Sequence, residues 1–258
     1  MINYLLAELD WNLLILLLAG FVAGFVNVIA GGGSLITLPA LIFLGLPPAV
    51  ANGTNRLGIL LQTTSAVAGF RSKGINTFPF SLYGGLVAVV GSIIGAKIAV
   101  DIKGDLFNKI LAIVMIVVVA IIVLKPKVKA DQWLERTDGK YFWISMISLF
   151  FIGIYGGFIN AGVGFILILL LSMVNRMSLV KANATKVTIV FIYTLAAFLV
   201  FVFNDKVSWI HGLFLAIGNG TGAWISSRLS VKRGDGFIRI FLIVMVSLMA
   251  IKLWFFDL

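Results

Sequence analysis

The fold is decided by the stretch Gly24-Phe25-Val26-Asn27-Val28-Ile29-Ala30-Gly31-Gly32-Gly33-Ser34, which returns in altered form as Gly157-Phe158-Ile159-Asn160-Ala161-Gly162-Val163-Gly164. Each copy interrupts a hydrophobic run with glycine and polar residues. A second polar cluster follows each copy at a similar distance, first Ala51-Asn52-Gly53-Thr54-Asn55-Arg56 and then Ala182-Asn183-Ala184-Thr185-Lys186. Helix-breaking motifs at matched positions in two hydrophobic halves are typical of transporters built from two repeats.

The composition is that of a polytopic membrane protein. The chain has 258 residues, of which 61% are hydrophobic and 12% charged, whereas soluble domains average about half apolar and a quarter charged. Apolar runs such as 13–30 and 237–256 approach or exceed the ~20 residues that span a bilayer. Because the N-terminus carries Glu8 and Asp10 and no small-residue cleavage site, we do not expect a cleaved signal peptide.

The charged and reactive residues exclude several classes of function. The net charge is +10, but most Lys and Arg residues lie in short connections, where they set membrane orientation rather than bind nucleic acid. The absence of cysteine removes disulfides, thiolate catalysis and iron–sulfur chemistry. His211 is the single histidine, so we expect no metal site. Without a Ser/His/Asp set, a P-loop or a dinucleotide fingerprint, we expect neither an enzyme nor a bound cofactor.

The hydrophobic runs divide the chain into two halves. We expect a first transmembrane repeat at 1–125, a cytoplasmic linker at 126–140 and a second repeat at 141–258. The predicted fold is all-α, with about eight to ten membrane segments. The expected segments are 12–29, 33–46, 49–71, 77–100 and 105–124 in the first half, and 141–160, 163–175, 177–203, 207–228 and 236–256 in the second.

The short segments 33–46 and 163–175 and the loop charges predict an inverted arrangement. Each short segment makes only roughly 20 Å of helix, which favours re-entrant hairpins with the segments before them, although a thin full crossing is also compatible. An N-terminus outside places thirteen cationic residues inside and five outside. This positive-inside bias means that the first half starts outside and the second inside, so the repeats have inverted topology.

Small residues four apart recur in both halves. Gly20-x-x-x-Gly24 matches Gly153-x-x-x-Gly157, and Gly91-x-x-x-Gly95 matches Gly218-x-x-x-Gly222. This spacing lets membrane helices approach closely, so we interpret these glycines as packing positions rather than as ligands.

Arg56 and Lys186 are the two basic residues that lie inside hydrophobic segments. A buried cation in a bilayer costs several kcal/mol unless it is paired or hydrated, which makes both residues functional candidates. All ten Asp and Glu residues lie at termini or in connections. The missing counter-charge is therefore expected to be an anionic substrate; the alternative is snorkelling to the headgroups.

The motif itself supplies further candidate ligands. Ser34 is a good N-cap residue, and uncapped N–H groups at a helix start form an anion site that glycine leaves accessible; a flexible turn would look the same. The neutral polar residues can orient a substrate or satisfy backbone freed by broken helices. Gln62 and Thr63 are weaker candidates for lining the path. The predicted substrate-binding residues are Asn27, Gly31, Gly32, Gly33, Ser34, Asn52, Thr54, Asn55, Arg56, Asn160, Gly162, Gly164, Asn183, Thr185 and Lys186.

The pattern resembles the TauE/SafE sulfite exporter family, also called the toluene-sulfonate uptake permease family. The matching features are Gly24-x-x-Asn27-x-x-Ala30-Gly31-Gly32-Gly33-Ser34-Leu35-Ile36-x-x-Pro39 and Asn52-x-Thr54-Asn55, with degenerate second copies at 157–164 and 182–186. The second copy lacks the triple glycine and the proline. The resemblance implies a multi-spanning carrier in the bacterial inner membrane that moves sulfur-containing anions such as sulfite, thiosulfate, sulfoacetate or another organosulfonate.

The sequence therefore predicts a secondary transporter that works by alternating access. Its expected partners are a small anion, possible coupling ions and membrane lipids, with no nucleic acid; the oligomeric state is left open. A passive anion channel with the same central site is the alternative. A membrane enzyme would need a reactive triad or metal cluster, which the sequence lacks.

Overall fold

The computed structural model describes residues 2–123 and 135–255, and every regular element in these ranges is helical. The predicted all-α fold is thus confirmed. The elements are α1 (Ile2–Ile29), α2 (Ser34–Phe43), α3 (Pro48–Arg71), α4 (Phe80–Asp101), α5 (Gly104–Val123), α6 (Gly139–Phe158), α7 (Val163–Leu169) with its π-helical continuation η1 (Leu170–Val174), α8 (Leu179–Phe203) and α9 (Trp209–Phe255). Most of the predicted linker 126–140 lies outside the described residues.

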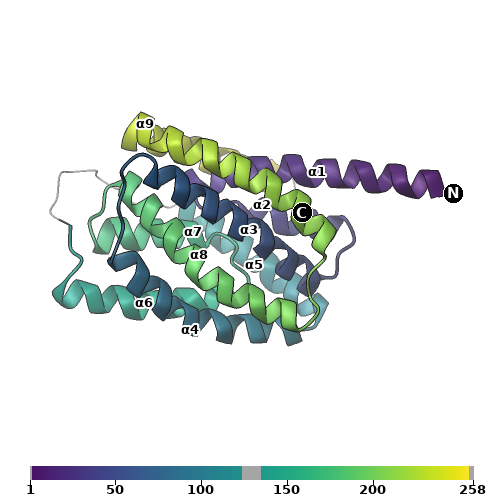
Figure 1. Cartoon of the computed structure of the whole chain (residues 1–258), viewed down its shortest axis with the longest axis horizontal. Helices are drawn as coiled ribbons and strands as arrows, with labels where there is room; N and C mark the ends of the chain where they lie inside the picture. The colour runs from purple at the N-terminus through teal and green to yellow at the C-terminus, as the bar shows by residue number, and fades with distance from the viewer. Residues whose placement is uncertain (1, 124–134, 256–258) are drawn as a thin grey trace.

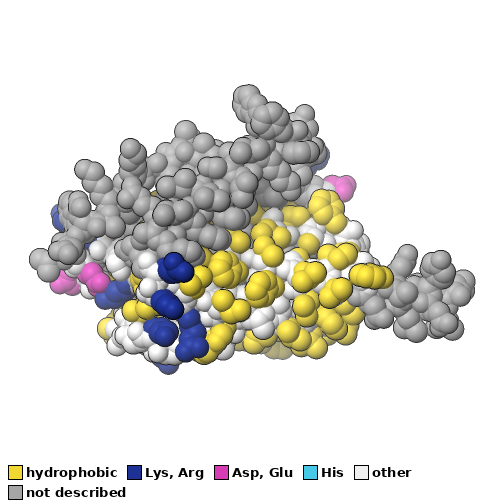
Figure 2. All heavy atoms as spheres, turned by 90° about the horizontal axis from the view of Figure 1, so that it is seen from above, with side chains coloured by type: hydrophobic (Ala, Val, Ile, Leu, Met, Phe, Trp, Pro, Cys, Tyr) yellow, Lys and Arg dark blue, Asp and Glu magenta, His cyan; other side chains and the backbone are white. Residues whose placement is uncertain are grey.

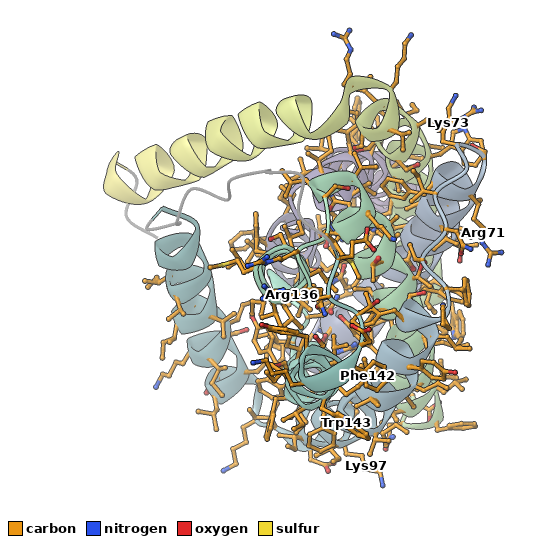
Figure 3. All side chains as sticks on the ribbon, turned by 90° about the vertical axis from the view of Figure 1, so that its left-hand side faces the viewer. Arg71, Lys73, Lys97, Arg136, Phe142 and Trp143 are labelled. Carbon is orange, nitrogen blue, oxygen red and sulfur yellow. The ribbon has the colours of Figure 1, made fainter. Side chains whose placement is uncertain are left out.

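One predicted boundary is wrong. We expected separate segments at 207–228 and 236–256, but α9 runs through both without interruption. The intervening polar stretch contains Lys232 and Arg233 and no proline. Lys and Arg are good helix formers, and only proline removes the backbone donor that continues a helix. The change from apolar to polar composition was therefore not a helix end, although the α9 ribbon changes direction along its length (Figure 3).

Each half begins with a helical hairpin whose tip lies inside the molecule. α1 ends at Ile29, and the chain reverses through Gly31, whose φ of +92° is open to glycine. Gly33 N donates to Asn27 Oδ1 at 3.2 Å, which holds the start of α2 against the end of α1. In the second half the reversal runs through Asn160 (φ +56°) and Gly162 (φ +71°). Figure 1 shows α1 entering from the right-hand end and α6 from the left-hand end.

The two halves interlock through their fourth helices. α4 packs on α6 and α8, which belong to the second half, while α9 packs on α1 and α3, which belong to the first. α3 and α8 pack against each other between these groups (Figure 1). The contacts of α4 with the second half thus correspond to those of α9 with the first half. The hairpin of each half packs against a helix of the other half.

The glycine pairs make this interlocking possible. A Cβ on Gly24 would overlap the backbone of Asn219 in α9, and one on Gly222 would overlap the carbonyl of Phe21 in α1. In the other contact, a Cβ on Gly157 would overlap the backbone of Ser92 in α4. The helix backbones therefore touch, as small-residue spacing predicts for membrane helices, and the predicted packing role of the four glycine pairs is confirmed.

Large hydrophobic side chains are exposed on the described surface, while two cations are buried in the interior. Trp143 is 67% exposed and Phe151 63%, while Arg56 and Lys186 are 0% and 2% exposed. In the coloured part of Figure 2, hydrophobic side chains lie over the middle of the visible face, and several Lys and Arg side chains gather toward its left-hand end. Four described helices are long and apolar enough to cross a membrane, namely Trp11–Ile29, Phe80–Asp101, Gly139–Phe158 and Leu179–Phe203. This inside-out pattern is that of a protein surrounded by lipid.

Candidate functional site

The tips of the two hairpins meet. A Cβ built on Gly31 would lie 2.5 Å from the Cα of Gly164 and 2.6 Å from the backbone nitrogen of Phe165, distances that no real side chain tolerates. A Cβ on Gly164 would likewise overlap Gly31. We call this contact of Gly31 with Gly164 the junction. Glycine is required at both positions because the two backbones are in contact.

Arg56, from α3, reaches the end of α6. Its side chain is fully buried, and Nη1 donates to the carbonyl of Gly156 at 3.1 Å. Nη2 donates to the carbonyl of Gly157 and, at 3.4 Å, to Asn52 Oδ1. The amide nitrogen of Asn52 donates in turn to the carbonyl of Phe158 at 2.7 Å. The guanidinium therefore sits against the negative end of the α6 dipole, which favours a cation there.

Lys186, from α8, does the same at the end of α1. Its Nζ donates to the carbonyls of Asn27 and Val28, both at 2.9 Å, and to Asn183 Oδ1 at 2.7 Å. The amide nitrogen of Asn183 donates to the carbonyl of Ile29 at 3.4 Å. The last carbonyls of a helix have no partner within it, so the cation and the amide supply what the broken helix lacks. Both interior cations thus have backbone partners that sequence alone does not reveal.

Three N–H donors of α3 have no acceptor in the part of the chain that the structure describes. They are Asn55 Nδ2, Arg56 Nε and Gln62 Nε2, and the side chains are at most 2% exposed. Asn55 Oδ1 accepts from Thr37 Oγ1 at 2.6 Å, which fixes the direction of its amide nitrogen. A buried donor without a partner costs about 1–3 kcal/mol. Asn55 directly precedes Arg56 in the chain, and Gln62 lies further along α3. Unused buried donors such as these are complementary to a ligand that carries only acceptors.

Gln62 is one of the weaker candidates that the sequence offers. It lies seven residues after Asn55 and therefore on the same face of α3. Helical periodicity from the Asn52 cluster could have assigned it to this face. Its burial at 2% exposure could not have been inferred, because it depends on how α3 packs against other helices.

Several predicted site residues are engaged by their own surroundings. Asn160 Oδ1 accepts from Tyr193 Oη at 2.6 Å, which fixes the second tip. Thr54 Oγ1 accepts from Ser208 N at 2.8 Å, so this hydroxyl holds the segment that leads into α9. Thr185 Oγ1 donates to Met177 Sδ at 3.6 Å. These three side chains thus already have a hydrogen-bond partner within the protein.

Ser34 and Gly32 also differ in part from expectation. Ser34 is the first residue of α2 and not its N-cap; Gly33 holds that position, with no side-chain cap. In the first turn of α2, the backbone N–H of Leu35 donates to the carbonyl of Gly32 at 3.0 Å, and that of Thr37 donates to the carbonyl of Gly33 at 3.2 Å. The tight turn therefore uses donors that we expected to be open. In the second copy, Gly162 is the residue before α7.

The buried side chains that the structure describes carry no negative charge. None of the buried polar side chains in the described residues is Asp or Glu, and the described residues hold no group of three His, Cys, Asp or Glu side chains that could bind a metal. The carboxylate of Glu135 instead lies 2.5 Å from Lys181 Nζ on the partly exposed end of the molecule. Interior charge near the junction is therefore positive.

Together, the apolar exterior, the spanning helices and the buried cations define an integral membrane protein with a polar interior site. Comparison with known proteins agrees. A sequence model of the sulfite exporter TauE/SafE family matches residues 16–253. The chain belongs to this family.

Relatives that are named as probable membrane transporters match the chain over nearly its full length. The chain is 31% identical over 247 residues to the probable membrane transporter protein ORF9 of a Sinorhizobium species, which covers 95% of this chain and 94% of that protein. It is 31% identical over 244 residues to a probable membrane transporter protein of Haemophilus influenzae, covering 93% and 94%. It is 29% identical over 239 residues to the probable membrane transporter protein YfcA of Escherichia coli, covering 93% and 88%. No solved structure gave a significant match. The protein is therefore a membrane transporter.

Proposed function

We propose that the protein is a secondary transporter that moves a small sulfur-containing anion, of the sulfite or organosulfonate class, across the bacterial inner membrane by alternating access. The observation that carries this proposal is the set of unused N–H donors of Asn55, Arg56 and Gln62 in a buried, carboxylate-free region. Oxyanions carry only acceptors when fully ionised, so they match such a site. The family description, sulfite exporter, supports the sulfur oxyanion class.

The charge around the junction favours an anion. Arg56 and Lys186 each bring one positive charge, and each faces a helix C-terminus worth roughly half a negative charge. The sum is positive by about one elementary charge. In a low-dielectric interior this excess strongly favours a bound anion. The cations thus support the substrate through their charge, while each of them also holds two backbone carbonyls.

We propose that the halves 1–125 and 141–258 are inverted repeats with the N-terminus outside. Two observations support this proposal. α4 and α9 each pack on helices of the other half, and α1 and α6 enter the molecule from opposite ends (Figure 1). Arg71, Lys73 and Arg136 lie at the end of the molecule that faces the viewer in Figure 3, where the chain leaves α3 and enters α6. Cationic ends face the cytoplasm in bacterial membrane proteins.

The junction favours a carrier over a channel. A channel needs a continuous path, but here the backbones of Gly31 and Gly164 touch and both residues are buried. An occluded centre between two hairpins is the arrangement expected for alternating access around a fixed site.

Binding to the purified protein tests this proposal. Asn55→Asp replaces an unused donor with an acceptor, so the Kd for sulfite measured by calorimetry should rise at least tenfold. Asn76→Asp is the matched control, because Asn76 is exposed and uses only its oxygen, which accepts from Phe78 N at 3.0 Å. Sulfate, taurine and sulfoacetate in the same assay define the substrate class. Equal affinities for the two variants, or no binding of any sulfur oxyanion, would contradict the proposal.

A further inference from the structure

We infer that Arg56 with Asn52, and Lys186 with Asn183, form two crossed clamps that hold the hairpins closed, and that the substrate opens the junction by competing for a clamp. This inference rests on the proposed function. It assigns the two cations as positioning residues of the hairpins in addition to their contribution of charge.

The two clamps have the same construction. The first takes three successive carbonyls at the end of α6, those of Gly156, Gly157 and Phe158. The second takes three successive carbonyls at the end of α1, those of Asn27, Val28 and Ile29. In each, the cation bonds the first two carbonyls and the asparagine amide bonds the third. Both halves thus contain the same arrangement although the cation is Arg in one and Lys in the other, which argues for a function that both halves need.

Each clamp joins one half of the chain to the other. Arg56 and Asn52 are on α3 of the first half and hold α6 of the second, across about a hundred residues of chain. Lys186 and Asn183 are on α8 of the second half and hold α1 of the first. Movement of a hairpin away from the opposite half therefore requires that its clamp be released, while the other clamp can stay closed.

The clamps can be released by an anion. An oxyanion carries a full negative charge, whereas a carbonyl oxygen carries only a partial one, so in a low-dielectric interior the anion attracts a cation more strongly. An oxyanion at the junction therefore competes with the helix carbonyls for the N–H groups of Arg56 and Lys186. A ligand shifts a conformational equilibrium only through its different affinity for the two states. Here the difference arises because a released cation can donate to the anion, whereas a clamped cation cannot donate fully.

Cysteine reporters test this inference, because the chain has no cysteine of its own. Ala30 follows the carbonyls held by Lys186 and Asn183, and Ala161 follows those held by Arg56 and Asn52; both are 0% exposed. Ala30→Cys and Ala161→Cys, made separately, are alkylated with N-ethylmaleimide and followed by intact mass.

The expected result is specific to one hairpin. Asn183→Ala should raise the alkylation rate at position 30 at least fivefold and leave position 161 unchanged, and Asn52→Ala should do the reverse. Asn204→Ala is the matched control, because its amide also donates to a helix-end carbonyl, Val200 O at 2.7 Å, but at an exposed site. If both reporters respond equally to each variant, or neither responds, the inference is overturned. Asn183→Ser and Asn52→Ser, which keep one donor, replace the alanine variants if these do not fold.

Sulfite separates the two proposals. Added to the proteins that carry only a reporter, it should raise alkylation at position 30 or 161. If each clamp variant affects only its own reporter but sulfite has no effect, the clamps are supported. The proposal that the anionic substrate releases them is then contradicted. If sulfite raises alkylation but each clamp variant affects both reporters equally or neither, anion binding is supported and the clamps are overturned.

Discussion

Gly31→Ala tests the contact between the hairpin tips. At a φ of +92° an L side chain is strained by about 1–2 kcal/mol. The new Cβ would also lie 2.5 Å from the Cα of Gly164, where ordinary contact begins at 3.4 Å. The tips must therefore separate by about 1 Å, and overpacking of this kind costs about 1–3 kcal/mol. The total expected loss of stability is about 2–5 kcal/mol.

Gly45→Ala is the matched control, because Gly45 has a φ of +88° and nothing within 4 Å of its added Cβ. It should show the backbone strain alone. The difference of about 1–3 kcal/mol corresponds to roughly 2–12 °C in Tm for a chain of this size. Tm is measured on purified protein in detergent by loss of the monodisperse peak after heating. Gly164→Ala should also lower Tm, in this case only because its Cβ overlaps the backbone of Gly31. Equal Tm values for Gly31→Ala and Gly45→Ala would refute the contact.

Three further results are expected. Gly157→Ala should lower Tm by several degrees because its Cβ overlaps the backbone of α4, whereas Gly104→Ala, whose nearest contact is 3.6 Å, should not; equal effects would contradict the close packing of α4 on α6. Glu135→Gln, measured by thermal unfolding, should change stability by less than about 1 kcal/mol, since the ion pair with Lys181 is partly exposed; a larger loss would show that this pair anchors α8. Ala130→Cys should react with impermeant maleimide only from the cytoplasmic side, and reaction from outside would overturn the proposed orientation.

The sequence was sufficient for features that depend on local pattern. The repeated motif located both hairpin tips, because a glycine-rich break in an apolar run has the same consequence wherever it occurs. The four-residue glycine spacing located the close helix contacts, such as that of Gly24 with α9. Neither result required knowledge of which helices were neighbours.

The partners of the interior cations could not be predicted in the same way. Arg56 bonds to carbonyls that are 100 and 101 residues away, and Lys186 to carbonyls 158 and 159 residues away. Backbone carbonyls carry no sequence signal, and they become available only where a helix ends. We expected a missing anion because only side-chain partners were visible. The continuity of α9 was missed for a related reason, since polar residues end a membrane segment without ending a helix.

Counterflow in proteoliposomes tests the central claim most directly. Vesicles loaded with unlabelled sulfite should take up external [³⁵S]sulfite faster than empty vesicles, and transiently above equilibrium. The reason is that unlabelled sulfite competes with labelled sulfite for the single inward-facing site of a carrier and so slows the exit of the label. Asn76→Asp should keep this behaviour, while Asn55→Asp should lose it. Uptake that is independent of internal sulfite, together with an ohmic current, would contradict alternating access and indicate a channel through the same junction.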